Sequence, residues 1–199
     1  MMRSFRLINC MIVMLMTSGM AIAQAPIPDL CNARDSLGLY NINIDIYTYH
    51  FSGLLLLKRI NDSTIRLVMN SEMGPKLLDM VLFPSGYKLL YAFHKLNHKR
   101  TVRTLYEDFG ALSGILTYKQ PFKVENILNA SYYTFDLSKR MKIIYTVDLL
   151  SHGPILGRFE EGKTVKSTFD YFFEQGTTQI ISIKLEHQHF KMVISLNKI

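Results

Sequence analysis

The chain has 199 residues, a formal net charge of +7, two cysteines and no tryptophan. Its length and its 48% share of apolar residues suit a single domain with a sizeable core. The basic residues are spread along the chain, without the dense basic stripes and stacking aromatics of nucleic-acid binders. This distribution argues against nucleic acid as a partner.

The N-terminus has the pattern of a secretory signal peptide. Arg3 and Arg6 precede an apolar stretch that runs to Met20, and the small-x-small sequence Ala21-Ile22-Ala23 follows. The pattern predicts a signal peptide over residues 1–23, cleaved after Ala23, whose loss lowers the formal charge from +7 to +5. A membrane anchor would need about 20 apolar residues. We therefore expect an exported, periplasmic protein, either free or associated with the outer membrane.

Neither cysteine predicts a lipid anchor or a disulfide. Cys10 comes before the end of the apolar stretch, and the residues that precede Cys31 are not those of a lipidation motif. After cleavage Cys31 would be the only cysteine of this sequence, so we expect no internal disulfide.

The mature chain is expected to contain one domain. Residues 24–39 contain Pro26 and Pro28 and little periodicity, which predicts an N-terminal linker, and residues 40–199 form the predicted domain. Its first and third strands show the period-two pattern that is typical of half-buried strands, and the second contains four consecutive leucines from Leu54. Five strands are expected before any helix, at about 41–47, 52–60, 65–69, 77–83 and 87–93.

The fourth and fifth of these strands are apolar on both faces. In the fourth, Leu78 and Met80 face one side and Val81 the other. In the fifth, Leu89 and Tyr91 are expected to share a face. An antiparallel sheet with one wet face alternates between apolar and polar side chains. We therefore expect something apolar to cover each face of this part of the sheet.

An amphipathic helix is predicted over residues 102–112, where apolar residues recur at three- and four-residue intervals. Basic residues precede and enter this helix: Lys95, His98, Lys99, Arg100 and Arg103. Positive charge at a helix start opposes the helix dipole, so this basic cluster does not serve helix stability. It is either a solvated loop end or a surface patch that contacts an envelope protein or an anionic membrane surface.

Strand patterns return after Pro121 and continue to the C-terminus. A change of phase across Glu186–His189 predicts a tight hairpin between the last two strands. The strands are expected at about 132–137, 142–149, 155–160, 165–173, 181–185 and 190–196. The order of five strands, a helix and five or six strands predicts a mainly β (α+β) fold. We expect a curved antiparallel sheet or incomplete β-barrel, covered by one main amphipathic helix.

Catalytic and metal-binding motifs are not evident. Ser113 stands one position late for the nucleophile elbow of a hydrolase. His187 and His189 are expected in a turn, and no third ligand with suitable spacing accompanies them. We therefore expect neither an enzyme nor a cofactor nor a metal site.

A sheet that is apolar on both faces has few stable arrangements. It can be a curved wall around an apolar ligand, one wall of a dry two-layer core, or a small outer-membrane β-barrel. The barrel is the third choice, because its strands should run about 9–11 residues and no helix should interrupt them. The residues expected to line a ligand cavity are Leu55, Leu57, Leu67, Met69, Leu78, Met80, Leu89 and Tyr91 on the sheet, with Leu105 and Phe109 closing it from the helix.

The string FSGLLLLKR, which begins at Phe51, is followed by strand pairs and a helix. This arrangement resembles the start of periplasmic lipoprotein carriers of the LolA and LolB type. The likeness covers roughly residues 52–114, where the chain also resembles uncharacterised exported proteins of Bacteroidota. The resemblance implies a strongly curved antiparallel sheet, covered by helices, whose cavity takes acyl chains. The carriers also have tryptophan in their early strands and an arginine that holds the lid closed. This chain has no tryptophan, and Arg66 or Arg103 would have to be that arginine.

Together these observations predict an exported, non-enzymatic protein that binds an acyl chain, a lipid or a lipoprotein in the cavity of a curved sheet. Its partner would then be a lipid or an acylated protein. The alternative is an envelope protein–protein interaction module with a dry core and no ligand. A cavity distinguishes these two predictions.

Overall fold

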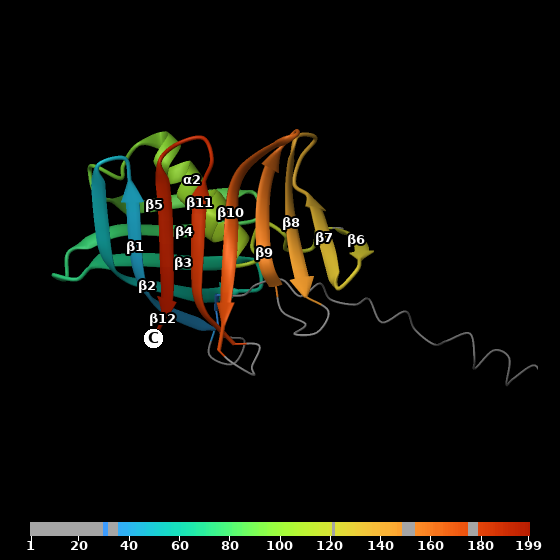
Figure 1. Ribbon diagram of the computed structural model, residues 1–199. Coiled ribbons are helices and arrows are strands. Elements are labelled where there is room, and N and C mark those ends of the chain that lie inside the picture. The colour runs from blue at the N-terminus through green and yellow to red at the C-terminus, as the bar shows by residue number, and fades with distance from the viewer. Residues whose placement is uncertain (1–29, 32–35, 121, 149–153, 175–178) are drawn as a thin grey trace, which may run out of the picture.

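The computed structural model describes residues 30–31, 36–120, 122–148, 154–174 and 179–199 (Figure 1). The predicted signal peptide, its cleavage site and most of the predicted linker lie outside the described residues. Within the described ranges, no helix is both long enough and apolar enough to cross a membrane.

Twelve strands form one sheet, and one helix, α2 (Lys99–Leu112), separates the fifth strand from the sixth. The strands are β1 (Leu37–Ile46), β2 (Tyr49–Asn61), β3 (Thr64–Ser71), β4 (Lys76–Phe83), β5 (Gly86–Ala92), β6 (Phe122–Ile127), β7 (Ala130–Asp136), β8 (Met141–Asp148), β9 (Pro154–Glu161), β10 (Thr164–Phe173), β11 (Ile180–His187) and β12 (Met192–Lys198). Their order in the sheet is β5-β4-β3-β2-β1-β12-β11-β10-β9-β8-β7-β6.

The first and last strands join the two parts of the sheet. β1 pairs antiparallel with β12, from Tyr40 opposite Lys198 to Ile46 opposite Met192. The N-terminal half of the sheet (β1–β5) and the C-terminal half (β6–β12) therefore form one continuous surface, with β5 and β6 at its two edges. All pairs of neighbouring strands are antiparallel.

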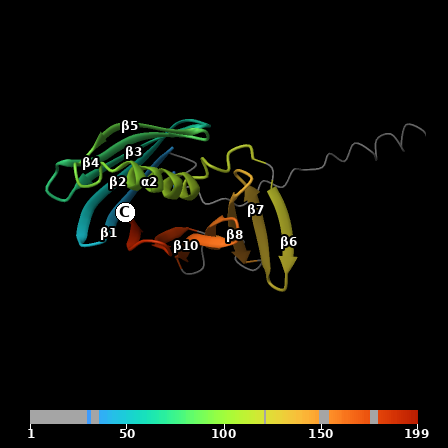
Figure 2. The ribbon, with the colours of Figure 1, turned by 90° about the horizontal axis from the view of Figure 1, so that it is seen from above.

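The sheet is strongly curved, and helix α2 lies on its concave side. Figure 2, which views the molecule from above, shows the two halves bending around the helix. The predicted fold class, a mainly β chain with a curved antiparallel sheet and one covering helix, is confirmed.

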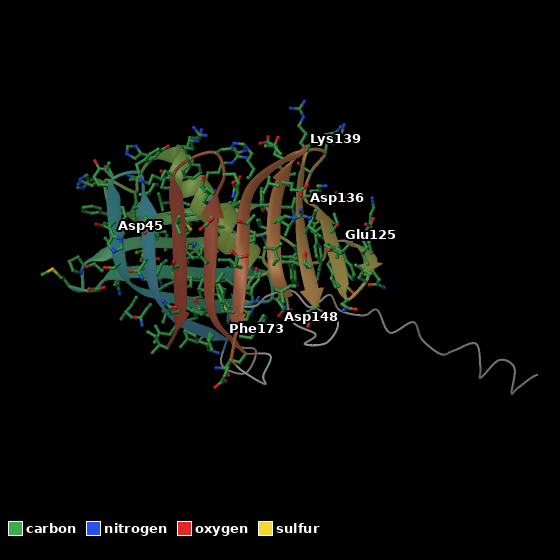
Figure 3. The ribbon with its side chains drawn as sticks, viewed as in Figure 1. Asp45, Glu125, Asp136, Lys139, Asp148 and Phe173 are labelled. Carbon is green, nitrogen blue, oxygen red and sulfur yellow. The ribbon has the colours of Figure 1, made fainter. Side chains whose placement is uncertain are left out.

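Seven strands follow the helix, rather than the five or six expected from the sequence. The additional one is β6, the edge strand, where Phe122 is half-buried and the other side chains are exposed. Figure 3 shows Glu125 of this strand at the far end of the sheet from helix α2. Because the strand has no buried face, it lacks the period-two alternation by which the other strands were predicted.

The concave face of the N-terminal half is the centre of the core. Alternate residues of β1, β2 and β3 are buried, as the period-two patterns of the first and third of these strands predicted. Neighbouring strands place these side chains opposite one another: Leu55 faces Met69 and Met69 faces Leu78, while Leu57 faces Leu67 and Leu67 faces Met80. All six are essentially inaccessible to solvent.

Helix α2 lies on the concave side of β4, and no described helix lies on its convex side (Figure 2). Asp79 is nevertheless buried there. Arg66 donates to both carboxylate oxygens, from Nε at 3.1 Å and from Nη2 at 3.0 Å, and Lys76 Nζ donates at 2.7 Å. The side chains of Arg66 and Lys76 thus shield an ion cluster on an otherwise apolar face.

A β-bulge changes the facing of β5. Asp79 pairs with Tyr91 and Met80 pairs with Leu89, so Leu90 is an extra residue without a partner. Leu89 therefore faces the core, whereas Tyr91 faces the convex side and is 44% exposed. The prediction that Leu89 and Tyr91 share a face is wrong, because one extra residue reverses the facing of those beyond it.

Part of the predicted linker belongs to the core. β1 begins at Leu37, inside the segment predicted as linker. Leu30 and Cys31 are each only 1% exposed, and the Tyr40 hydroxyl donates to the carbonyl oxygen of Leu30 at 2.8 Å. The chain is therefore attached to the sheet before its first strand begins.

The Asp79 cluster predicts a pH dependence of stability. The hydrogen bond from Arg66 lowers the pKa of Asp79 below its ordinary value of 3.8, and burial opposes this shift only in part. The carboxylate therefore stabilises the fold above pH 3.8, and this contribution is lost as the pH falls through the lower folded pKa. Asp79→Asn should lower the free energy of unfolding by about 1–2 kcal/mol at pH 7, discounted for the partly exposed cations. The difference should shrink as the pH falls below 3.8 and through the lower folded pKa of Asp79.

Urea unfolding of the two proteins across this pH range measures the difference. Asp62→Asn, in the exposed β2–β3 turn, is the matched control and should change stability by less than about 0.5 kcal/mol at every pH. A destabilisation by Asp79→Asn that is the same at pH 2 and pH 7 would show that the carboxylate charge is not what stabilises this face.

Candidate functional site

Helix α2 owes its position to packing rather than to its own ends. His98 at its N-cap makes no side-chain capping bond, and its first turn has no acidic residue. Short helices in water depend on tertiary packing of an apolar face. Val102, Leu105 and Phe109 supply that face, and each is at most 2% exposed.

Three polar contacts fasten the helix to both halves of the sheet. The Tyr106 hydroxyl donates to the carbonyl oxygen of Phe83, at the end of β4, at 3.0 Å. The Tyr145 hydroxyl, on β8, donates to the carbonyl oxygen of Ala111 at 2.8 Å. The third contact joins the helix to β11 through an ion pair.

In this ion pair, His187 Nε2 lies 2.9 Å from Asp108 Oδ2, with side chains that are 6% and 3% exposed. Burial raises the pKa of Asp108, and the hydrogen bond from His187 opposes that shift. His187 is the last residue of β11, so the prediction that it lies in a turn is wrong; the turn spans residues 188–191. No group of three or more potential metal ligands occurs in the part of the chain that the structure describes.

The residues predicted to line a cavity form a packed core instead. The six sheet residues on β2, β3 and β4 are covered by the helix, and Leu105 and Phe109 are fully buried against the sheet. Leu89 is half-buried at the edge of this core, and Tyr91 faces outward. The two hollows described below have none of these residues in their walls.

Two adjoining hollows lie along one flank of helix α2, with volumes of about 290 Å³ and 460 Å³. Arg103, Glu107, Met141 and Phe159 line both of them, so they form one continuous depression between the helix and the C-terminal half of the sheet. We call this depression the flank groove.

The two ends of the flank groove differ in chemistry. The polar end contains Arg100, Lys166, His187 and His189, beside the ring of Phe190. The apolar end lies between the β4–β5 turn and the β7–β8 turn and is lined by Tyr87, Tyr106, Leu116 and Leu137. The groove is therefore amphipathic along its length.

The predicted basic patch is divided by the structure. Lys95 Nζ lies 4.3 Å from the centre of the Tyr49 ring, and Lys99 and His98 are exposed at the helix start. Arg100 and Arg103 line the flank groove instead. Arg103 is 2.9 Å from Glu107, four residues along the helix. Arg66, the other arginine considered for closing a lid, lies on the convex face with Asp79.

The part of the groove wall that follows the first half of the helix in sequence was not predicted. Met141 and Phe159 belong to β8 and β9, and Leu116 follows the end of the helix. The only available signal was the apolar alternation of those strands, and it does not indicate which strands the helix leaves uncovered.

The buried pair of Asp108 and His187 predicts a strong energetic coupling. Removal of one partner of a buried pair typically costs about 3–5 kcal/mol, because the other group stays buried without compensation. We expect His187→Ala and Asp108→Ala each to destabilise the fold, and the double variant to be more stable than additivity predicts by more than about 1 kcal/mol. Chemical denaturation of the four proteins measures this coupling energy.

The matched control is the exposed pair Arg103 and Glu107 on the same helix. The same cycle there should give a coupling energy of no more than about 0.5 kcal/mol. Equal coupling energies for the two pairs would contradict the role assigned to burial.

Comparisons with known proteins support the fold. No family model matches the chain, and no curated protein matches its sequence. A LolA superfamily protein from Nitrosomonas europaea has a similar structure, with a TM-score of 0.53 and 12% identity, over 85% of this chain and 86% of that chain.

Two further solved structures have lower TM-scores. One is a domain provisionally described as an outer membrane lipoprotein-sorting protein from Vibrio parahaemolyticus, with a TM-score of 0.46, 12% identity and coverage of 82% and 83% of the two chains. The other is a DUF1329 family protein from Desulfovibrio piger, with a TM-score of 0.45, 10% identity and coverage of 84% and 85%. The curved twelve-stranded sheet and its covering helix are therefore a LolA-like fold.

Proposed function

We propose that the protein binds an acyl chain, a lipid or an acylated protein in the flank groove, without catalysing a reaction. The observation that carries this proposal is the continuous, partly apolar groove between helix α2 and the concave face of the sheet. A LolA superfamily protein with the same fold supports it.

The size and lining of the groove suit such a ligand. Small-molecule sites typically have volumes of about 300–1,000 Å³ and mostly apolar walls. The two hollows, at about 290 Å³ and 460 Å³, lie at the lower end of this range. Affinity would come from apolar area removed from water, at about 25 cal/mol per Å². Met141 and Leu137 are half-buried and so have apolar surface left to cover.

A larger ligand would need the helix to move. Leu55, Leu67 and Met80 would become lining only if helix α2 left the concave face, because Leu105 and Phe109 now cover them. Such a ligand would enter through the groove, and its additional acyl chain would occupy the space that the core side chains now fill. Such a displacement would break the three polar contacts that fasten the helix.

The proposed location is the bacterial periplasm, free or at the outer membrane. This part of the proposal rests on the basic and apolar N-terminal segment and on the small-x-small sequence that ends at Ala23. An exported carrier would meet acylated proteins and lipid surfaces there.

A second candidate is an envelope protein–protein interaction module without a ligand. The full burial of Leu105 and Phe109 favours it, since a carrier cavity was expected where the structure has a packed core. In this case the basic residues outside the groove, Lys95, His98 and Lys99, would contact the partner. Ligand binding by the native protein distinguishes the two candidates.

A polar substitution in the groove tests the proposal. Met141→Gln should weaken the binding of hexadecanol, a neutral probe, about tenfold, because a buried amide without a partner costs about 1–3 kcal/mol. Leu128→Gln makes a comparable change at a side chain that is 95% exposed, in the β6–β7 turn, and should leave affinity unchanged. Displacement of a fluorescent apolar dye gives the two dissociation constants.

Thermal unfolding of both variants controls for folding. Failure of the folded wild-type protein to bind either hexadecanol or its carboxylate counterpart, palmitate, would contradict the carrier proposal and favour the interaction module. Binding that both substitutions leave unchanged would place the ligand outside the flank groove.

A further inference from the structure

The charges at the polar end of the flank groove are nearly, but not fully, balanced. Three basic side chains there have an acidic neighbour. Arg103 is 2.9 Å from Glu107, Lys166 Nζ is 2.7 Å from Glu161, and His187 is 2.9 Å from Asp108. All six groups line the polar end of the groove.

Arg100 is the exception. Among the described residues, no acidic side chain forms an ion pair with it, and its guanidinium carbon lies 5.9 Å from the centre of the Phe190 ring. A cation–π contact does not use the N–H donors of the guanidinium, which stay available to another acceptor. His189 lines the groove next to Phe190 and adds a ring nitrogen to the same end.

The ring of Phe190 is itself held in place. It lies 4.6 Å, centre to centre, from the ring of His187, which is paired with the buried Asp108. The ring that contacts Arg100 is therefore attached to the contact between helix α2 and β11.

From these contacts we infer that the polar end of the flank groove binds the single negative charge of an amphiphile, a carboxylate or a phosphodiester, through Arg100. The inference rests on the proposed function and specifies the ligand's chemistry and orientation. The acyl chain extends past Met141 and Phe159 toward Leu116 and Leu137, and the head group lies against Arg100 and His189. One anionic charge matches Arg100, since the other arginine and the lysine that line this end each have an acidic partner.

A neutral amphiphile fits this groove less well. Its chain would remove water from around Arg100 while its hydroxyl supplies only a neutral acceptor, and desolvation of a charge without an opposite charge is costly. A charged head group supplies a charge-assisted hydrogen bond, which is shorter and stronger than a neutral one. The groove should therefore discriminate by head group and not only by chain length.

The test compares ligands that share a chain and differ in charge. Palmitate and hexadecanol are titrated against the wild-type protein, and lysophosphatidylglycerol and lysophosphatidylcholine extend the series to phosphodiesters. We expect a monoanion to bind at least about tenfold more tightly than its uncharged or zwitterionic counterpart. Preference for palmitate identifies a carboxylate ligand, and preference for lysophosphatidylglycerol identifies a lipid phosphodiester.

Variants assign the preference to Arg100. Arg100→Gln should abolish it, by weakening palmitate binding and by strengthening hexadecanol binding, since no charge is then desolvated, and Arg100→Lys should retain part of it. Lys99→Gln removes the same charge from the neighbouring exposed residue, which does not line the groove, and should keep the preference. Thermal unfolding confirms that each variant is folded.

The possible failures are distinguishable. If charged and neutral ligands bind equally tightly, or if Arg100→Gln keeps the preference, the inference about Arg100 is overturned while the proposed function stands. If none of the four ligands binds the folded wild-type protein, the proposed function fails as well.

Discussion

The attachment of helix α2 to both halves of the sheet is the constraint on which the rest of the structure depends. Tyr106 fixes the helix to the end of β4, and Tyr145 and His187 fix it to β8 and β11. These contacts join elements that are far apart in the sheet order, so they hold the concave face at one curvature. The flank groove exists because the helix covers the N-terminal half closely and leaves a gap beside β8 and β9.

The helix itself could not persist alone. Its N-terminus carries basic residues and no capping bond, so its own electrostatics oppose it. The buried ion pair of Asp108 and His187 joins it to the sheet, at the expense of desolvating both groups. The fold is therefore stable while helix α2 is docked, and the contacts between this helix and the sheet are those that must break for the helix to leave the concave face.

Most of the fold could be predicted from local periodicity. Alternation identified the buried residues of β1 and β3, because a strand with one wet face shows its period directly. Tyr91 was misplaced because the bulge at Leu90 depends on pairing with β4, which periodicity does not reveal. β6 was missed because an edge strand with exposed side chains has no apolar period.

The candidate site was harder to predict than the fold. The sequence predicted that the helix covers the N-terminal half, and Leu105 and Phe109 do lie there. It could not indicate that they would fill the space completely, because this depends on the distance between helix and sheet. The groove lining from Met141 and Phe159 arises only when the curved sheet brings the C-terminal half to the other flank of the helix.

Native mass spectrometry of the protein, purified from a bacterial periplasm without detergent, tests the central claim most directly. The account predicts a bound mass that extracts into organic solvent, or uptake of one added amphiphile per chain. A mass that stays equal to that of the chain alone, with no uptake of fatty acid or lysophospholipid, would contradict it.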